Sequence, residues 1–391
     1  MRRLRHFLQR KDRKYRKEDS ADASTPPLPF LPPWPSRASW EPVTQTQGIF
    51  RLPLELRHKI LCEAFGNKTI HIDLRIASSS SPTQSAGGGH PRHGRSPPLI
   101  EPSSRPSHDG NPCSNKMTWR WYSCVCHRNA PSVEGFQFEP HTDKCLRGEA
   151  KCDAWLGAFP DKCHVGAMGF LLSCKQGHDE LCDILFSTNT FFIESQPLID
   201  ALLRQGLPES PRITGAGMQM LISLQMRWVF TLFGTIDGSS EDSQRGRFIQ
   251  NLDLLPRAFP KLSQLHLIFD GPLYNKRTNP VSNLEEIETI LLKPLEALSK
   301  KVSDTLVAAM PTSLFDAFRR VAPPTPEEDK AIFKARGIWG LRVWYPFMAM
   351  EEDRGKPGKG LWIKSGPENS LDWRRDGSSF LHSHSPASVP G

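Results

Sequence analysis

The stretch LISLQMRWVF, residues 221–230, alternates apolar and polar side chains with a period of two. This is the period of a β-strand, whose successive side chains point to opposite faces of a sheet. One face would carry Ile222, Leu224, Met226, Trp228 and Phe230, and the opposite face Ser223, Gln225 and Arg227. We therefore predict a strand with one buried face and one face that is wet or thinly covered.

A weaker copy of this pattern follows about 41 residues later, where Leu265, Leu267 and Phe269 alternate with polar residues. A Gly/Ser-rich loop, residues 234–246, and a helical segment, residues 248–255 ended by Pro256, separate the two strands. A strand, a helix and a second strand predict a crossover connection and hence parallel pairing. Because this spacing exceeds the 20 to 29 residues of a leucine-rich repeat, any repeat would be irregular.

Further strands and helices are indicated on both sides of this unit. The strand patterns are residues 69–74, 191–193, 341–345 and 361–363, and the helical patterns are residues 170–185, 197–203, 284–298 with a bend at Pro294, and a helix opening at residues 325–328. Strands that alternate with helices are typical of the α/β class. We predict one domain over residues 48–373, with a single mixed sheet, packing helices and irregular leucine-rich-like units.

Three segments have compositions that do not support a core. Residues 1–47 are basic and then proline-rich, residues 78–117 are rich in Ser, Pro, Gly and His, and residues 374–391 form a Ser/His/Pro tail. We expect all three to be disordered, the second as an insertion within the domain.

The formal net charge of +8 is concentrated in the first 20 residues, which hold nine Lys or Arg and three acidic residues. The remaining residues share about +2, so no broad nucleic-acid-binding face is expected. The basic tail is consistent with an inert arm, a nuclear import signal or a mitochondrial presequence. Nine cysteines without an apolar leader, and no apolar run of membrane-spanning length, predict an intracellular protein of the cytoplasm or nucleus.

The first predicted helix spans residues 52–65, LPLELRHKILCEAF, with Pro53 at its first turn. Apolar side chains cover more than half of its circumference, and its polar arc is narrow. Such a helix is either buried in the core of its own domain or shared between that domain and a partner protein.

Seven stretches in chain order resemble the large fungal family of uncharacterised proteins that begin with an F-box-like motif and carry a domain of unknown function. The stretches, spread over residues 48–373, are GIFRLPLELRHKILCEAF, TIHIDL, WRWYSCVCHR, GFLLSCKQGHDELCDILFSTNTFFI, LISLQMRWVF, FPKLSQLHLIF and LRVWYPF. The resemblance implies an α/β fold and an adaptor role, with a Skp1-type protein of a ubiquitin ligase as partner. On this reading, Leu52, Pro53, Leu56 and Ile60 would dock the partner.

The two F-box-like segments, residues 52–61 and 171–176, are more than 100 residues apart in the sequence. In an F-box the corresponding helices are adjacent. Partner binding would therefore require the fold to bring these segments together.

Residues 113–164 are rich in cysteine and histidine and form a candidate zinc region. The candidate ligands are Cys124, Cys126, His127, Cys145 and Cys152. Their spacing is not that of a zinc knuckle, which separates paired cysteines by two to four residues. The sequence therefore predicts free thiols and no cofactor, with a zinc-stabilised structural domain as the alternative.

Enzyme motifs are absent from the sequence, which has no GxxxxGK[ST], GxGxxG, HExxH or GxSxG. A cysteine nucleophile would need a histidine base in space, which a single sequence does not reveal. We therefore predict a non-catalytic protein-interaction module with no membrane partner, for which the sequence identifies no small-molecule substrate, with an unrecognised enzyme as a further alternative.

Overall fold

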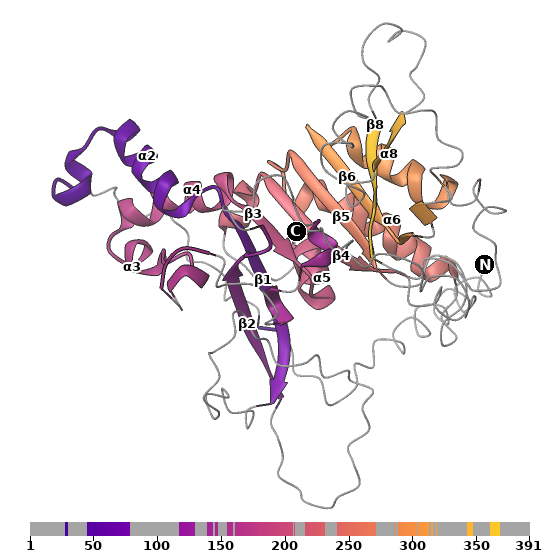
Figure 1. The fold of residues 1–391 in the computed structure, drawn as a ribbon, viewed down its shortest axis with the longest axis horizontal. Coiled ribbons are helices and arrows are strands. Elements are labelled where there is room, and N and C mark those ends of the chain that lie inside the picture. The colour runs from indigo at the N-terminus through magenta and orange to yellow at the C-terminus, as the bar shows by residue number, and fades with distance from the viewer. Residues whose placement is uncertain are drawn as a thin grey trace, which may run out of the picture.

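The computed structural model contains one eight-stranded mixed sheet with helices packed against it (Figure 1). It describes residues 28–29, 45–78, 117–129, 139–143, 145–147, 155–158, 161–205, 207, 216–230, 241–270, 285, 288–302, 304–312, 314–315, 318, 342–346 and 360–367. The predicted α/β class and single mixed sheet are confirmed.

The strand order across the sheet is β2-β1-β3-β4-β5-β6-β8-β7. The strands are β1 (Thr69–Ser78), β2 (Met117–Val125), β3 (Thr190–Ile193), β4 (Ser223–Val229), β5 (Gln264–Asp270), β6 (Thr305–Met310), β7 (Arg342–Pro346) and β8 (Gly360–Ser365). The six inner strands are parallel, and the two edge strands β2 and β7 pair antiparallel with β1 and β8. The predicted parallel crossover between residues 223 and 270 is therefore confirmed.

The helices and short helical turns fill the connections between these strands. They are η2 (Gly48–Arg51), α2 (Leu54–Phe65), η3 (Pro140–Thr142), η4 (Cys145–Arg147), η6 (Asp161–Cys163), α3 (Met168–Leu171), α4 (Lys175–Thr188), α5 (Gln196–Arg204), η7 (Ala216–Met220), α6 (Glu241–Ala258), the π-helical turn η8 (Glu288–Leu292) and α8 (Lys293–Ser299). Helix α6 packs against both α5 and α8, so these three helices form one layer.

The main core lies between the sheet and this layer of helices. Leu224, Met226 and Trp228 of β4 point into it, as the alternating pattern predicts, together with Leu265 and Leu267 of β5. The register places the first residues of β3, β4, β5 and β6 side by side at positions 190, 223, 264 and 305. The spacings of 33, 41 and 41 residues are those of an irregular strand–helix repeat.

The opposite face of the sheet carries His71, Arg227 and Lys364. Residues 139–143 and 145–147, which we call the 139–147 segment, lie across it. Within this segment Glu139 binds Lys364 of β8 at 2.9 Å, and the carbonyl oxygen of His141 accepts a hydrogen bond from Arg227 of β4. The carboxylate of Asp143 lies 3.2 Å from His71 of β1. The segment therefore spans the sheet from β8 to β1, and the face predicted to be wet is covered at these points.

Several predicted boundaries differ from the structure. Pro256 does not end its helix, because α6 continues to Ala258, where buried Leu255, Ala258 and Phe259 anchor the last turn. The predicted loop 234–246 is wrong at its end, since α6 begins at Glu241. The strand β6 was not predicted. Other predictions concern residues outside the described part of the chain. They are the rest of the predicted insertion (residues 79–116), the helix opening at residues 325–328, the tail 374–391, and most of the N-terminal region (residues 1–27 and 30–44).

Candidate functional site

Helix α2 lies on the outside of the molecule, and Leu61 is its only buried residue. Leu54, Leu56 and Ile60 are 57%, 50% and 45% exposed, while Leu52 is half-buried and Pro53 is an exposed residue at the N-terminal cap. The resemblance assigns Leu52, Pro53, Leu56 and Ile60 to partner binding, and none of these side chains is buried in the core. The alternative, in which this helix fills the core of its own domain, does not hold for them.

Helices α2, α3 and α4 pack together at one end of the molecule, although α2 and α3 are more than 100 residues apart in the sequence (Figure 1). The ring of Phe170 on α3 lies 5.9 Å from Phe50 and 6.3 Å from Phe65, measured between ring centroids. At the C-terminal end of α2 the packing is so close that a Cβ on Gly66 would lie 2.6 Å from Thr188 Oγ1 of α4. Helix α2, which holds most of residues 52–61, therefore lies beside α3 and α4, between which residues 171–176 form the connection.

An ion pair fixes the angle between α2 and α4. The guanidinium of Arg57 donates from Nε and Nη2 to the two carboxylate oxygens of Glu180, at 3.0 and 2.7 Å. The hydrogen bond from Arg57 lowers the pKa of Glu180, and Gln176 donates a further bond to it. A bidentate pair of this kind is geometrically specific, so it orients the exposed side of α2 relative to α4.

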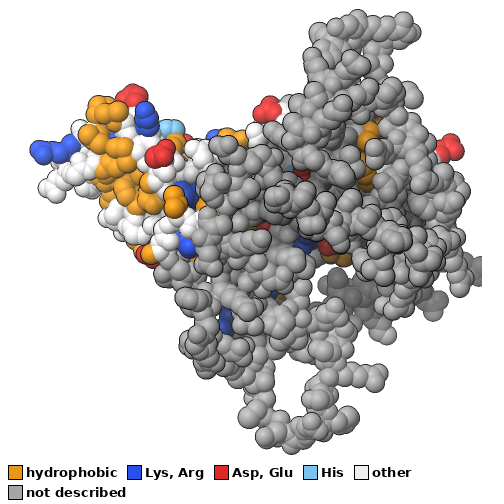
Figure 2. All heavy atoms as spheres, viewed as in Figure 1, with side chains coloured by type: hydrophobic (Ala, Val, Ile, Leu, Met, Phe, Trp, Pro, Cys, Tyr) orange, Lys and Arg blue, Asp and Glu red, His pale blue; other side chains and the backbone are white. Residues whose placement is uncertain are grey.

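The exposed apolar side chains of α2 and α3 define a surface that we call the helical face. It consists of Leu56 and Ile60, which lie on one side of α2, together with Met168 on α3 and Leu172 directly after α3, while Leu54 is exposed on another side of α2. Hydrophobic side chains gather over α2 and α3 in the space-filling view (Figure 2). Met168 and Leu172 are 64% and 76% exposed. Clustered exposed apolar residues are typical of sites where another protein binds.

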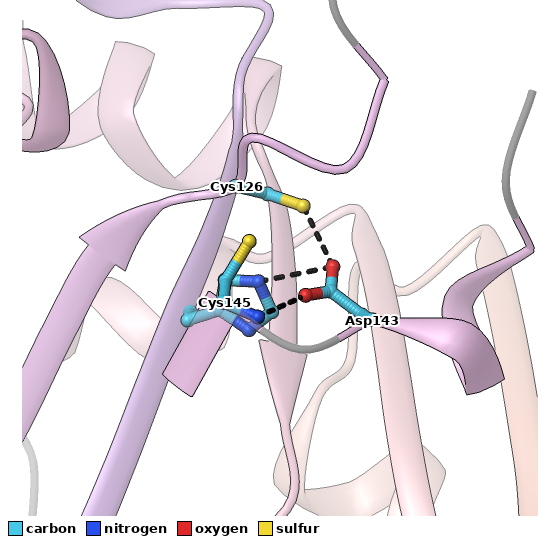
Figure 3. A group of neighbouring side chains, drawn as sticks. Cys126, Asp143 and Cys145 are labelled. Carbon is cyan, nitrogen blue, oxygen red and sulfur yellow. Dashed lines mark hydrogen bonds and ion pairs between the residues drawn. The ribbon is translucent and has the colours of Figure 1, made fainter. Parts of the chain in front are cut away.

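A second candidate site is buried beside β1 and consists of four side chains of metal-binding type, which we call the Cys/His/Asp group. Its members are His71, Cys126, Asp143 and Cys145, and their ligand atoms all lie within 4.8 Å of one another. His71 belongs to β1, Cys126 directly follows β2, and Asp143 and Cys145 come from the 139–147 segment. Figure 3 shows Cys126, Asp143 and Cys145 pointing toward one another.

Asp143 is the centre of the hydrogen bonds in this group. Its Oδ2 accepts from Cys126 Sγ at 2.8 Å and lies 3.2 Å from both His71 Nε2 and Arg128 Nη1. Its Oδ1 accepts from the backbone N–H of Cys145 at 2.8 Å. The sulfur of Cys145 accepts in turn from the backbone N–H of His127 at 3.2 Å.

The ionisation of these groups follows from their mutual contacts. Burial opposes charge on Asp143, but His71 and Arg128 outweigh it and hold the pKa of this carboxyl far below its usual range. Burial likewise opposes a charged His71, yet Asp143 and Cys126 raise the pKa of the imidazole to about 9. The contact between the two thiols lowers the pKa of Cys126 and raises that of Cys145.

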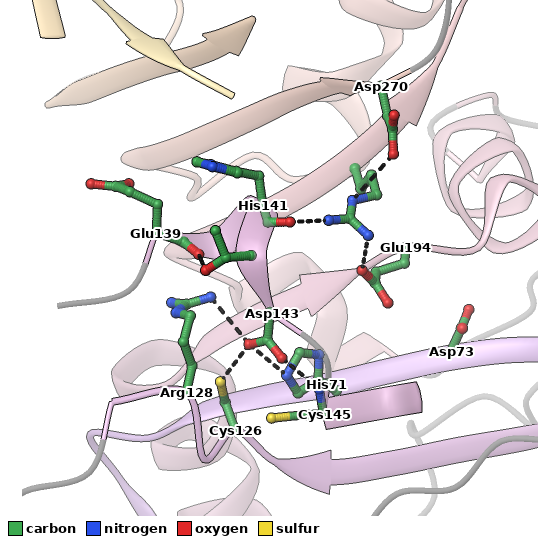
Figure 4. Close-up of polar contacts among 12 residues, drawn as sticks. His71, Asp73, Cys126, Arg128, Glu139, His141, Asp143, Cys145, Glu194 and Asp270 are labelled. Carbon is green, nitrogen blue, oxygen red and sulfur yellow. Dashed lines mark hydrogen bonds and ion pairs between the residues drawn. The ribbon is translucent and has the colours of Figure 1, made fainter. Parts of the chain in front are cut away.

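Further polar residues surround the group on the same face of the sheet (Figure 4). Arg227 binds Glu194 at 2.7 Å and lies 3.7 Å from Asp270. Both Arg227 and Glu194 are about nine-tenths buried. Arg227 also donates to the carbonyl oxygen of His141, and this bond holds the 139–147 segment against the sheet.

The structure brings together only two of the residues predicted as metal ligands, Cys126 and Cys145. Cys124 is buried beside them but does not belong to the group, and Cys152 lies outside the described residues. His127 turns away, stacks on Trp155 at 4.7 Å and contacts the carbonyl oxygen of Lys162.

The two ligand-type residues that sequence reasoning missed are His71 and Asp143. The sequence offers a signal for His71 only. The alternation of residues 69–74 places this histidine on the face of the strand opposite Ile70, Ile72 and Leu74.

Comparison with models of known protein families, with curated proteins and with solved structures finds no match to this chain. Among the described residues, every helix is too short or too polar to cross a lipid bilayer.

Proposed function

We propose that this chain is a non-catalytic protein-interaction module whose helical face binds a partner protein. The observation that carries the proposal is the exposure of Leu56 and Ile60, on one side of a helix that is otherwise held in place by its neighbours. Exposed apolar side chains on a fixed helix gain most from a partner, because little conformational entropy is lost on binding. The face therefore suits an apolar groove on another protein.

We take the partner to be a Skp1-type adaptor of a ubiquitin ligase. The resemblance to F-box-like proteins implies this partner, and the packing of α2 against α3 and α4 supports it. Residues 171–176 form the end of α3, a turn and the start of α4, so two short helices, and not one later helix, lie beside α2. The chain would then present other proteins to the ligase.

An enzymatic role is less well supported. Cys126 and His71 are a thiol and an imidazole in contact with a carboxylate, which is the composition of a nucleophilic triad. They are, however, 6% and 1% exposed, so that a substrate would not reach the sulfur in this conformation.

Substitution of Ile60 by aspartate tests the proposal. We expect Ile60→Asp to weaken binding to a purified Skp1-type adaptor by about tenfold or more, since loss of a buried aliphatic contact costs about 1.5 to 3 kcal/mol. The matched control is Ile249→Asp on α6, because Ile249 and Ile60 are 44% and 45% exposed. Affinity is measured by calorimetry with the full chain. Equal affinities for both variants, or no binding by the unsubstituted protein, would refute this function.

A further inference from the structure

We propose that His71, Cys126, Asp143 and Cys145 bind one structural zinc ion. The group offers one nitrogen, two sulfurs and one oxygen, which is the ligand number and type of a closed tetrahedral zinc site. In such a site neighbouring ligand atoms are about 3.3 to 3.8 Å apart, as follows from the usual zinc–ligand bond lengths. The observed limit of 4.8 Å requires only small side-chain movements to reach this geometry.

The poorly satisfied ring nitrogens of buried His71 point to a ligand independently of the composition. Its side chain is 1% exposed, yet neither ring nitrogen has a hydrogen bond of good geometry among the described residues. The 3.2 Å approach to Asp143 is close enough for a hydrogen bond, but its direction is unfavourable. A buried polar atom without a partner costs about 1 to 3 kcal/mol. A metal bond from one ring nitrogen would remove part of that cost.

The residues around the group orient its ligands as zinc sites require. The N–H of Cys145 holds Asp143 Oδ1, which leaves Oδ2 directed at the thiol and the imidazole. The N–H of His127 points at the sulfur of Cys145. Backbone donors of this kind stabilise ligated carboxylates and thiolates.

The charges of the proposed site also balance. A zinc ion with two thiolates and one carboxylate carries a net charge of −1, and the guanidinium of Arg128, 3.2 Å from Asp143, neutralises it. Borderline-soft zinc fits a mixed sulfur, nitrogen and oxygen set better than magnesium or calcium, which prefer oxygen ligands alone.

The proposed ion would join three parts of the chain that are distant in sequence: β1, the end of β2 and the 139–147 segment. Its role would be to fix that segment across the polar face of the sheet. The site is separate from the helical face, so failure of the zinc proposal and failure of the proposed function are distinguishable. Ile60→Asp should keep its zinc, and a ligand variant that folds should keep its adaptor affinity.

Elemental analysis of the full chain, purified without chelators, tests the site. We expect about one zinc per chain in the unsubstituted protein and at least a fivefold loss in Cys126→Ser and His71→Gln. Cys182→Ser is the matched control, because this thiol is half-buried on α4 and outside the group. Less than about a tenth of a zinc per chain, with no uptake on dialysis against zinc chloride, would overturn the proposal. So would full zinc content in both ligand variants.

A cobalt derivative provides a test that does not depend on the folding of variants. Unsubstituted protein stripped of metal and loaded with Co²⁺ should show the visible bands of tetrahedral cobalt and a thiolate-to-metal charge-transfer band. The thermal midpoint should fall on treatment with a chelator and recover with zinc but not with magnesium. An octahedral spectrum without thiolate bands, or a midpoint unchanged by the chelator, would contradict the site.

Discussion

Replacement of Trp228 by alanine is expected to lower the free energy of unfolding by about 3 to 5 kcal/mol, the usual range for truncating a buried large aromatic residue. Trp228 is fully buried on β4, where its ring lies 5.3 Å from Phe230 and 6.3 Å from Phe248. Phe248 also contacts Phe269 of β5, so the four rings join the two strands to α6. The loss is measured by urea unfolding of the full chain.

Trp228→Phe is the matched control for this prediction. The indole N–H of Trp228 has no hydrogen-bond partner among the described residues, so phenylalanine loses ring volume but no hydrogen bond. We expect its cost to be less than half that of alanine. Equal losses for the two variants would mean that ring packing at this position does not stabilise the core.

Replacement of Arg227 by alanine is expected to cost about 3 to 5 kcal/mol, because it leaves a buried carboxylate without its cation. Arg227 and Glu194 are each about nine-tenths buried, and Arg227 also donates to the carbonyl oxygen of His141. The matched control is Arg247→Ala, since Arg247 is 47% exposed and pairs with Asp200 at the surface. That control should change stability by about 1 kcal/mol or less.

The cost of Arg227→Ala should depend on pH. Burial raises the pKa of Glu194 above its ordinary value, and Arg227 opposes that rise. Without Arg227 the pKa of Glu194 rises further, so the folded variant binds this proton more tightly than the unfolded chain does. Stability then falls as pH increases. The deficit relative to the unsubstituted protein should be smallest near the ordinary carboxylate range, about pH 4.5, and grow toward neutral pH. A deficit independent of pH would contradict this account.

The sheet could be predicted from the sequence where period-two alternation is strong. Residues 221–230 combine five large apolar side chains on one face with polar side chains on the other, and β4 follows this pattern. The strand β6 was missed because Leu306, Ala308 and Met310 offer a weaker contrast, and its burial is decided by the neighbouring strands β5 and β8. Pro256 does not end α6, because tertiary packing at the end of this helix overrides the local helix-breaking tendency of proline.

The sites were less predictable because both depend on long-range contacts. The apolar character of residues 52–65 was visible, but whether Leu56 and Ile60 face the core or solvent depends on how α2 packs on α3 and α4. His71 and Asp143 are 72 positions apart in sequence and meet only because the 139–147 segment crosses the sheet. No local spacing signals that contact.

Hydrogen exchange of the full chain, alone and with a Skp1-type adaptor, tests most directly whether the helical face is the docking surface. The adaptor should slow exchange of the backbone amides in α2 and α3, while α6 and the inner strands stay unchanged. Unaltered exchange at α2 and α3 in the presence of saturating adaptor, or protection confined to another part of the molecule, would contradict the account.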